Sequence, residues 1–198
     1  NYAKHLKALM LDGRIAVSTA TNRISSCNVV FQVLRGDTKI RIDKIGELLG
    51  VKRSYIRRSV PNGMHLPDVE SLQQQLMEAG LARIAAVVGL TSSCGMRLRE
   101  SILADLPRLE REAREIGKIN IQEGAKGGRR GAFAERWIPA SDEVKAAIEY
   151  AMTVSPKSSR NLLALSEQYK NFLRGPIEKA RREFLGISIK GFHELRAA

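Results

Sequence analysis

The sequence has only two cysteines, Cys27 and Cys94, in 198 residues. Two cysteines are too few for a disulfide framework or a structural zinc site, so we expect a reduced, cytoplasmic protein. No apolar run approaches the roughly 18 residues that cross a bilayer, and we expect no membrane-spanning helix. Aromatic residues make up only 5%, whereas hydrophobic residues as a whole make up 43%. That apolar share excludes a disordered chain, because its burial can offset the conformational entropy lost on folding.

The sequence also lacks a cluster of carboxylates with the spacing of metal ligands, so we expect neither a metal nor another cofactor. It begins with Asn1 rather than Met and has no charged-then-apolar leader, so no secretory signal is expected. It stops at Ala198, soon after the start of a predicted helix. We therefore expect a fragment whose two ends are boundaries within a longer protein.

Positive charge is abundant and unevenly distributed. The net charge is +12, and residues 1–62 contain 12 Lys or Arg but only four Asp or Glu, so two thirds of the charge lies there. A chain this basic predicts a polyanionic partner, with nucleic acid as the first choice. The stretch 59–67, SVPNGMHLP, has the composition of a linker. We expect a basic domain over 1–62, a linker over 63–67 and a second domain over 68–198.

The basic domain is predicted to be a bundle of short helices. Apolar spacing places them at residues 2–11, 18–34, 42–49 and 54–60, with Ser18 or Thr19 as the cap of the second helix. One face of that helix would carry Ile24, Cys27, Val30, Phe31 and Leu34. Helices 42–49 and 54–60, joined by a short turn, have the form of a helix-turn-helix. Its basic residues, Lys52, Arg53, Arg57 and Arg58, are expected to contact phosphates. A solvated basic face is the alternative.

The second domain is predicted to be mainly helical, with one β-hairpin. Helices are expected at 68–79, 81–89, 91–106, 107–117, 141–152, 159–173 and 176–185. Period-two alternation predicts a strand in 118–125, and residues 134–139 are the candidate return strand. The turn between them, at 126–131, is basic. The fold class is therefore mainly α with one small β-hairpin.

Three short motifs occur in an informative order. Residues 95–100 read GMRLRE, residues 124–130 read GAKGGRR, and residues 191–196 read GFHELR. They resemble the G-[LM]-R-x-x-E box, the lysine-bearing hairpin and the H-x-L-R box of the tyrosine recombinases, the phage-integrase family. The resemblance spans nearly the whole chain and is nearest to integrases of bacterial prophages and mobile elements. It implies a helical core-binding domain that clamps DNA, followed by a catalytic domain.

The residue types in these motifs suit phosphodiester chemistry. Arg97 and Arg196 are candidates to hold the non-bridging oxygens, because a guanidinium is planar, permanently charged and bidentate. Lys126 would protonate the leaving 5′ oxygen. His193, three residues before Arg196, would contact the phosphate or help to activate the nucleophile. Glu100, one turn after Arg97, is expected to orient an arginine or its helix.

Each assignment has an alternative. Arg99 could be the functional arginine of the first box in place of Arg97. Lys126 could be, like Arg129 and Arg130, only a basic loop residue that touches backbone phosphate. His193 could be structural. The residues expected to contact DNA are Arg23, Lys52, Arg53, Arg57, Arg58, Arg129 and Arg130.

The tyrosines depart from the family pattern. All four, Tyr2, Tyr55, Tyr150 and Tyr169, precede the H-x-L-R box, whereas the nucleophilic tyrosine of the family follows it. Tyr150 and Tyr169 are expected to pack between helices. The resemblance implies that the intact protein forms a 3′-phosphotyrosyl link and recombines double-stranded DNA as a tetramer, near the bacterial nucleoid. This chain alone would bind DNA without cleaving it.

Two other classes of function remain open. One is a helix-turn-helix regulator, for which Arg97, Lys126 and Arg196 would be scattered in space. The other is a recombinase fragment that acts as an accessory DNA-binding protein. The recombinase hypothesis instead predicts that the three residues converge around one phosphate-sized site.

Overall fold

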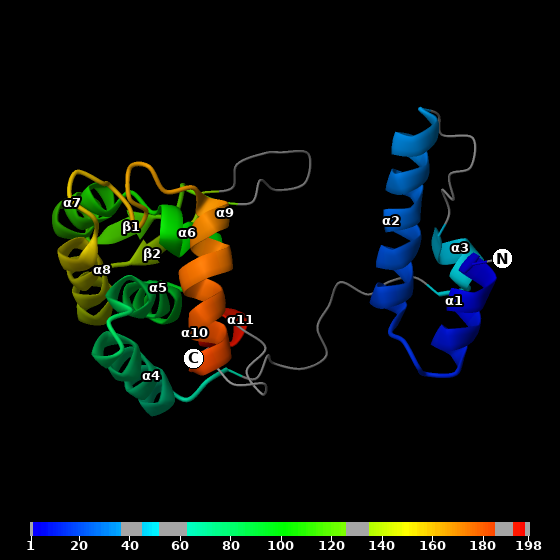
Figure 1. Cartoon of the computed structure of the whole chain (residues 1–198), viewed down its shortest axis with the longest axis horizontal. Helices are drawn as coiled ribbons and strands as arrows, with labels where there is room; N and C mark the ends of the chain where they lie inside the picture. The colour runs from blue at the N-terminus through cyan, green and yellow to red at the C-terminus, as the bar shows by residue number, and fades with distance from the viewer. Residues whose placement is uncertain (1, 37–44, 52–62, 126–134, 185–191, 197–198) are drawn as a thin grey trace. The chain divides into compact units, whose positions relative to one another are not determined.

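The computed structural model describes residues 2–36, 45–51, 63–125, 135–184 and 192–196, except the side chains of His193 and Glu194. The chain divides into two compact units, residues 1–60 and 61–198, which are described separately (Figure 1). Its described part is mainly helical, with a two-stranded antiparallel sheet. None of the helices in this part is long and apolar enough to cross a membrane.

The first unit contains α1 (Tyr2–Leu11), α2 (Val17–Arg35) and α3 (Ile45–Leu49). Its buried core is formed by one or two residues from each helix: Leu6, Ala20, Ile24 and Leu49. Helix α2 ends as the sequence predicts, because Gly36 adopts the left-handed conformation, with φ of +67°, and donates its N–H to the Gln32 carbonyl. The predicted cap is wrong, since the N-cap is Ala16, which makes no side-chain hydrogen bond.

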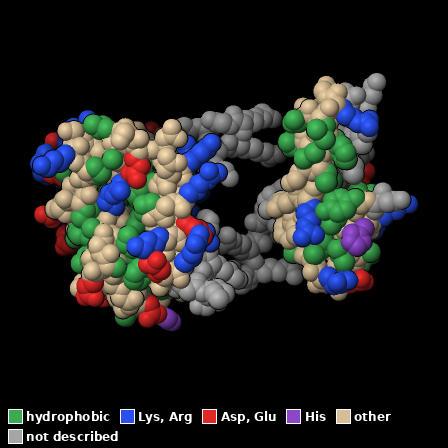
Figure 2. All heavy atoms as spheres, viewed as in Figure 1, with side chains coloured by type: hydrophobic (Ala, Val, Ile, Leu, Met, Phe, Trp, Pro, Cys, Tyr) green, Lys and Arg blue, Asp and Glu red, His purple; other side chains and the backbone are tan. Residues whose placement is uncertain are grey.

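The C-terminal half of α2 exposes apolar side chains. The exposed residues are Val29, Val30, Phe31, Val33 and Leu34. Figure 2 shows the green of hydrophobic side chains gathered on this unit. Of the predicted apolar face, Ile24 is buried and Cys27 is partly buried, whereas Val30, Phe31 and Leu34 are exposed. The second helix of the predicted helix-turn-helix, residues 54–60, lies outside the described residues, as do all four of its basic residues: Lys52, Arg53, Arg57 and Arg58.

The second unit is built around α5 (Ala82–Ser93). Helices α4 (Leu66–Glu78), α6 (Leu98–Leu103) and α8 (Asp142–Val154) pack against it (Figure 1). Every residue from 84 to 91 is buried, which explains why the sequence of this helix is apolar all round. The prediction that α5 ends at Gly89 is wrong. This glycine lies inside the helix, where a Cβ atom would come within 2.7 Å of the Gln73 side chain.

Residues 91–106 are predicted to be largely helical after a break at 92–95. The break is present, at 94–97, but the helix that follows it, α6, has only six residues and ends at Leu103. The next helix, α7 (Leu106–Ile116), starts with a side-chain cap, in which Asp105 accepts a hydrogen bond from the Arg108 amide. Gly117, with φ of +69°, ends it. The chain then enters the sheet.

The sheet pairs β1 (Lys118–Asn120) with β2 (Trp137–Pro139) in antiparallel register, with Ile119 opposite Ile138. Both strands were predicted, although each is shorter than its apolar alternation indicates. The basic turn, residues 126–131, lies outside the described residues. After β2, Ser141 caps α8 as predicted, by accepting a hydrogen bond from the Val144 amide.

The last part of the chain differs from the prediction. Residues 155–168 contain no helix, and the expected pair of helices is one helical run: α9 (Tyr169–Phe172), the π-turn η2 (Leu173–Ile177) and α10 (Glu178–Glu183). Pro176 lies within the π-turn and did not break the run. A wider turn brings Phe172 and Ile177, five residues apart, to the same buried side. A short helix, α11 (Phe192–Leu195), contacts α5.

Candidate anion-binding site

The first box of the sequence forms the start of α6. Gly95 has φ of +57° and turns the chain, and Arg97 is the N-cap residue of the helix. Glu100 folds back over this end: its Oε2 accepts the Arg97 backbone N–H at 2.6 Å, and its Oε1 accepts Arg97 Nη1 at 2.6 Å. One carboxylate therefore satisfies a helix-end amide and holds the Arg97 guanidinium at the same time.

A second arginine, Arg136, binds the same carboxylate. Arg136 Nη2 lies 2.6 Å from Glu100 Oε2, and Nη1 lies 3.4 Å from Oε1. The Glu100 side chain is fully buried. Burial alone would raise the pKa of Glu100, but the Arg97 amide and the guanidiniums of Arg136 and Arg97 outweigh it and lower that pKa below its ordinary value. Glu100 is therefore ionised at neutral pH.

Arg196 completes the cluster from the other end of the sequence. It follows α11, and its Nε donates a hydrogen bond to the Gly95 carbonyl at 2.6 Å. Partial burial lowers the pKa of Arg196, and so do the nearby charges of Arg97 and Arg136. Arg97 and Arg136 thus bind one buried carboxylate, and Arg196, which is 101 residues away from Gly95 in the sequence, lies close enough for its pKa to be affected by all three charges. The four groups have a net charge of +2.

Both ends of the sheet hairpin contact α6. Gly124, beyond β1, lies so close to α6 that a Cβ atom would be 2.7 Å from the Arg99 carbonyl oxygen. Arg136, directly before β2, is fixed through Glu100. A separate network holds β1 on α7, in which Arg108 binds the Asn120 carbonyl at 3.1 Å and Glu123 at 2.6 Å. These contacts link α6, α7 and the hairpin around the cluster.

The structure brings together Arg97, Arg196 and Glu100 of the predicted site residues. Lys126, Arg129 and Arg130 lie outside the described residues, as does the side chain of His193, whose backbone belongs to α11. Arg23 is exposed on α2.

Other residues that the sequence analysis considered near the site do not bind Glu100. Arg99 points to a different partner, with its guanidinium carbon 5.5 Å from the centre of the Tyr169 ring. Cys94 is buried, and burial raises the pKa of its thiol to about 12. Tyr150 and Tyr169 pack against the core, as predicted.

Sequence reasoning missed Arg136, although a signal was present. Strand side chains alternate between the two faces of a sheet, so Arg136 shares a face with Ile138. Ile138 packs against the core. An arginine in register with an inward-facing residue predicts a partly buried ion pair, which is what Glu100 provides.

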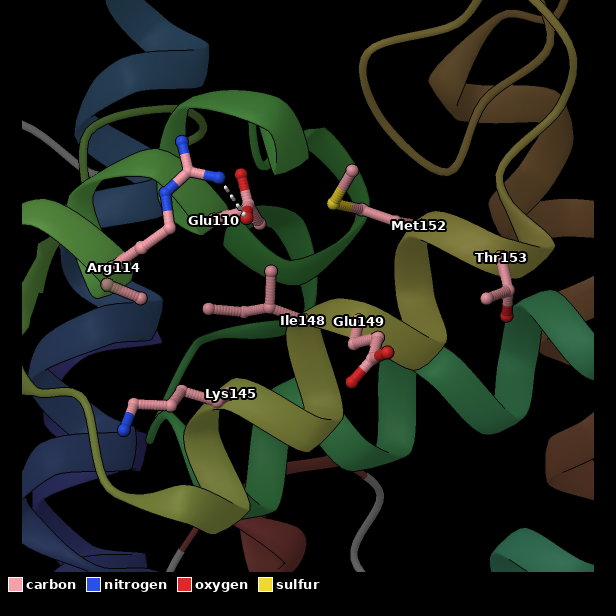
Figure 3. Close-up of a pocket in the computed structure, with 8 residues that line it drawn as sticks. Glu110, Arg114, Lys145, Ile148, Glu149, Met152 and Thr153 are labelled. Atoms are coloured by element: carbon pink, nitrogen blue, oxygen red, sulfur yellow. Dashed lines mark hydrogen bonds and ion pairs between the residues drawn. The ribbon is translucent and has the colours of Figure 1, made fainter.

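A groove elsewhere in the second unit has a different character (Figure 3). It has a volume of about 910 Å³ and lies between α7 and α8, over the apolar side chains of Ala113, Ile148 and Met152. Its charged residues are of both signs, and Arg114 and Glu110 form an ion pair at 3.3 Å. The groove therefore offers no concentration of positive charge, and the arginine cluster is the better candidate for an anion site.

Among the described residues, no three His, Cys, Asp or Glu side chains are grouped in a way that could hold a metal ion. The cluster instead offers guanidinium N–H groups, which donate hydrogen bonds to anions.

Comparison of the chain with protein-family models, with curated proteins and with solved structures finds no match. The resemblance to tyrosine recombinases therefore rests on the three motifs, and the functional argument rests on the geometry of the cluster.

Proposed function

We propose that this chain contains the DNA-binding and phosphate-activating parts of a tyrosine recombinase that integrates or recombines double-stranded DNA. The observation that carries the proposal is the convergence of three arginines on one place: Arg97 and Arg136 bind Glu100, and Arg196 binds the Gly95 carbonyl close to their charges. Two of these arginines come from the boxes that resemble the family. The basic residues 1–62 would form the core-binding domain that grips the DNA, and four protomers would act together on two DNA segments.

The cluster suits the charge that develops during strand cleavage. A phosphodiester carries one negative charge, and attack by a deprotonated hydroxyl gives a transition state with two. Three arginines and one glutamate provide a net charge of +2 before the substrate arrives. Donors that are already in place stabilise such a transition state without reorganising. Arg97 and Arg196 would hold the non-bridging oxygens, Lys126 would protonate the leaving oxygen, and His193 would assist.

The same convergence favours this function over a helix-turn-helix regulator, which gives no reason for Arg97 and Arg196 to lie together. No tyrosine of residues 1–198 follows the H-x-L-R box, and Tyr150 and Tyr169 pack against the core. We therefore propose that a tyrosine outside these residues is the nucleophile. Without one, the chain would act as an accessory DNA-binding protein.

The test uses protein expressed from its complete reading frame and a duplex that this protein selects from a random pool. We expect a covalent protein–DNA adduct that survives denaturant and is lost on protease treatment. Arg97→Ala should abolish the adduct and leave the DNA dissociation constant within about threefold, because this arginine acts on one phosphate among many. Arg111→Ala, at an exposed arginine on α7, is the matched control and should form the adduct normally.

Two results would contradict the proposal. An Arg97→Ala variant that still forms the adduct but binds DNA far more weakly would make Arg97 only a contact residue. Selective DNA binding by the unaltered protein without any adduct would support the accessory function instead.

A further inference from the structure

The Glu100 carboxylate creates a problem for an anion site, because a buried negative charge lies beside the arginine that should bind the anion. Arg97 alone would be largely neutralised by it. The two Oε atoms of Glu100, however, are shared between two guanidiniums, with Nη2 of Arg136 and Nη1 of Arg97 each at 2.6 Å. The guanidinium of Arg136 therefore makes the net charge of the site more positive by one.

We propose that Arg136 is a positioning residue that neutralises Glu100 and thereby leaves the charges of Arg97 and Arg196 available to a dianion. This inference deepens the proposed function and rests on it. Without Arg136, the remaining arginines and Glu100 would have a net charge of +1, which matches the ground-state phosphodiester. With Arg136 the net charge is +2, which matches the transition state.

The surroundings of Arg136 suit a residue held in one place. Its carbonyl accepts the Ile121 amide at 3.0 Å, and its own amide lies 3.4 Å from Asn120 Oδ1. Its side chain is 29% exposed, whereas that of Arg97 is 43% exposed. Arg97 is therefore the more accessible of the two to a ligand, and Arg136 is the less exposed partner of the buried carboxylate.

The experiment measures binding of two anions to the full chain by NMR titration at constant ionic strength. Dimethyl phosphate, a monoanion, represents the ground state, and sulfate, a dianion, represents the charge of the transition state. Coulomb energy is proportional to the charge of the ligand, so Arg136→Gln should weaken sulfate binding about tenfold and dimethyl phosphate binding only about threefold. Arg111→Gln, which changes the total charge equally, should alter neither affinity.

A double variant separates charge from simple tethering of the hairpin. Arg136→Gln combined with Glu100→Gln removes one charge of each sign and restores a net charge of +2. If Arg136 acts by charge, the double variant should recover most of the preference for sulfate. If it acts only as a structural link, the double variant should bind as weakly as the single variant or more weakly, which would overturn the inference.

The outcomes also separate this inference from the proposed function. Sulfate binding that is lost in Arg97→Ala and Arg196→Ala but unchanged in Arg136→Gln would refute the role of Arg136 alone. If the unaltered chain binds neither anion through Arg97 and Arg196, the phosphate site itself fails and the inference fails with it. Should Arg136→Gln not fold, Arg136→Lys keeps the charge and should retain the preference for sulfate.

Discussion

Gly124 allows a close approach between two backbone segments beside the site, because it has no Cβ atom. It lies where the loop after β1 meets α6, with φ of +67°, and a Cβ atom there would approach the Arg99 carbonyl oxygen to 2.7 Å and its carbon to 3.0 Å. Both atoms belong to the backbone and cannot turn aside as a flexible side chain could. This close approach fixes one end of the hairpin beside the helix that carries Arg97 and Glu100.

We expect Gly124→Ala to lower the free energy of unfolding by about 3 kcal/mol, because the left-handed conformation and the backbone clash both act against alanine. Gly117→Ala is the matched control. Gly117 has a similar φ of +69°, but nothing lies within 4 Å of its Cβ position, so only the conformational cost of about 1 kcal/mol should appear. Denaturant unfolding of both variants checks this, and equal losses would show that the close approach has no energetic consequence.

At the scale of elements, the sequence predicted best where a local signal starts or ends a helix. Gly36, Gly117 and Ser141 mark the boundaries expected of them, since each acts through its own backbone or side chain. The failures lie where tertiary packing overrides such signals. Gly89 remains inside α5 because a neighbouring side chain occupies the space beside it, and Pro176 remains inside a helical run because a π-turn accommodates it.

The residues of the candidate site also fall into those that local sequence predicts and those that depend on tertiary contacts. Arg97, Glu100 and Arg196 were predicted from motifs that are short and contiguous in the sequence. Arg136 was not predicted, because its role comes from a contact across 36 residues and is visible in the sequence only as an arginine in register with Ile138. An ion pair between residues far apart in the sequence leaves little trace in local sequence patterns. The sequence around Glu100 therefore did not show that two arginines bind it.

Arg83, on α5, binds the irregular segment 155–168 and contacts α9. Its Nη1 binds the Leu162 carbonyl at 3.0 Å and Glu167 Oε2 at 2.5 Å, and its guanidinium carbon lies 4.9 Å from the centre of the Phe172 ring. Burial alone would raise the pKa of Glu167, but the Arg83 hydrogen bond and the Ala164 amide lower it, so the pair is charged at neutral pH. One side chain therefore links three elements.

We expect Arg83→Met to lower the free energy of unfolding by about 2 kcal/mol, because it removes two hydrogen bonds and leaves the carboxylate of Glu167 without this partner. Arg114→Met is the control. Arg114 is 66% exposed and pairs with Glu110 at the surface, so its loss should cost about 0.5 kcal/mol or less. Thermal or denaturant unfolding measures both. A loss at position 83 no larger than at position 114 would mean that segment 155–168 is held by its own hydrogen bonds.

At the scale of the whole molecule, the two units differ in net charge and in their proposed functions. The first 62 residues carry two thirds of the net charge of +12. The rest of the chain carries the remaining +4, and the cluster of three arginines and one glutamate contributes +2 of that. This division predicts that affinity for DNA comes mainly from the first unit, through many phosphates, and that the second unit acts on a single phosphate.

Arg57 and Arg58 allow that division to be tested in the full chain. If both contact phosphates, their joint replacement by alanine should weaken DNA binding and reduce the slope of log K against log salt by about 2, since each contact contributes about 0.9. Arg181→Ala with Arg182→Ala is the matched control. This second adjacent pair is exposed on α10, and its replacement changes the net charge equally. Fluorescence anisotropy with duplex DNA at several salt concentrations gives both slopes. A control pair that flattens the slope as much as the first pair would show that binding follows total charge, and the predicted phosphate-contacting surface in residues 52–58 would be wrong.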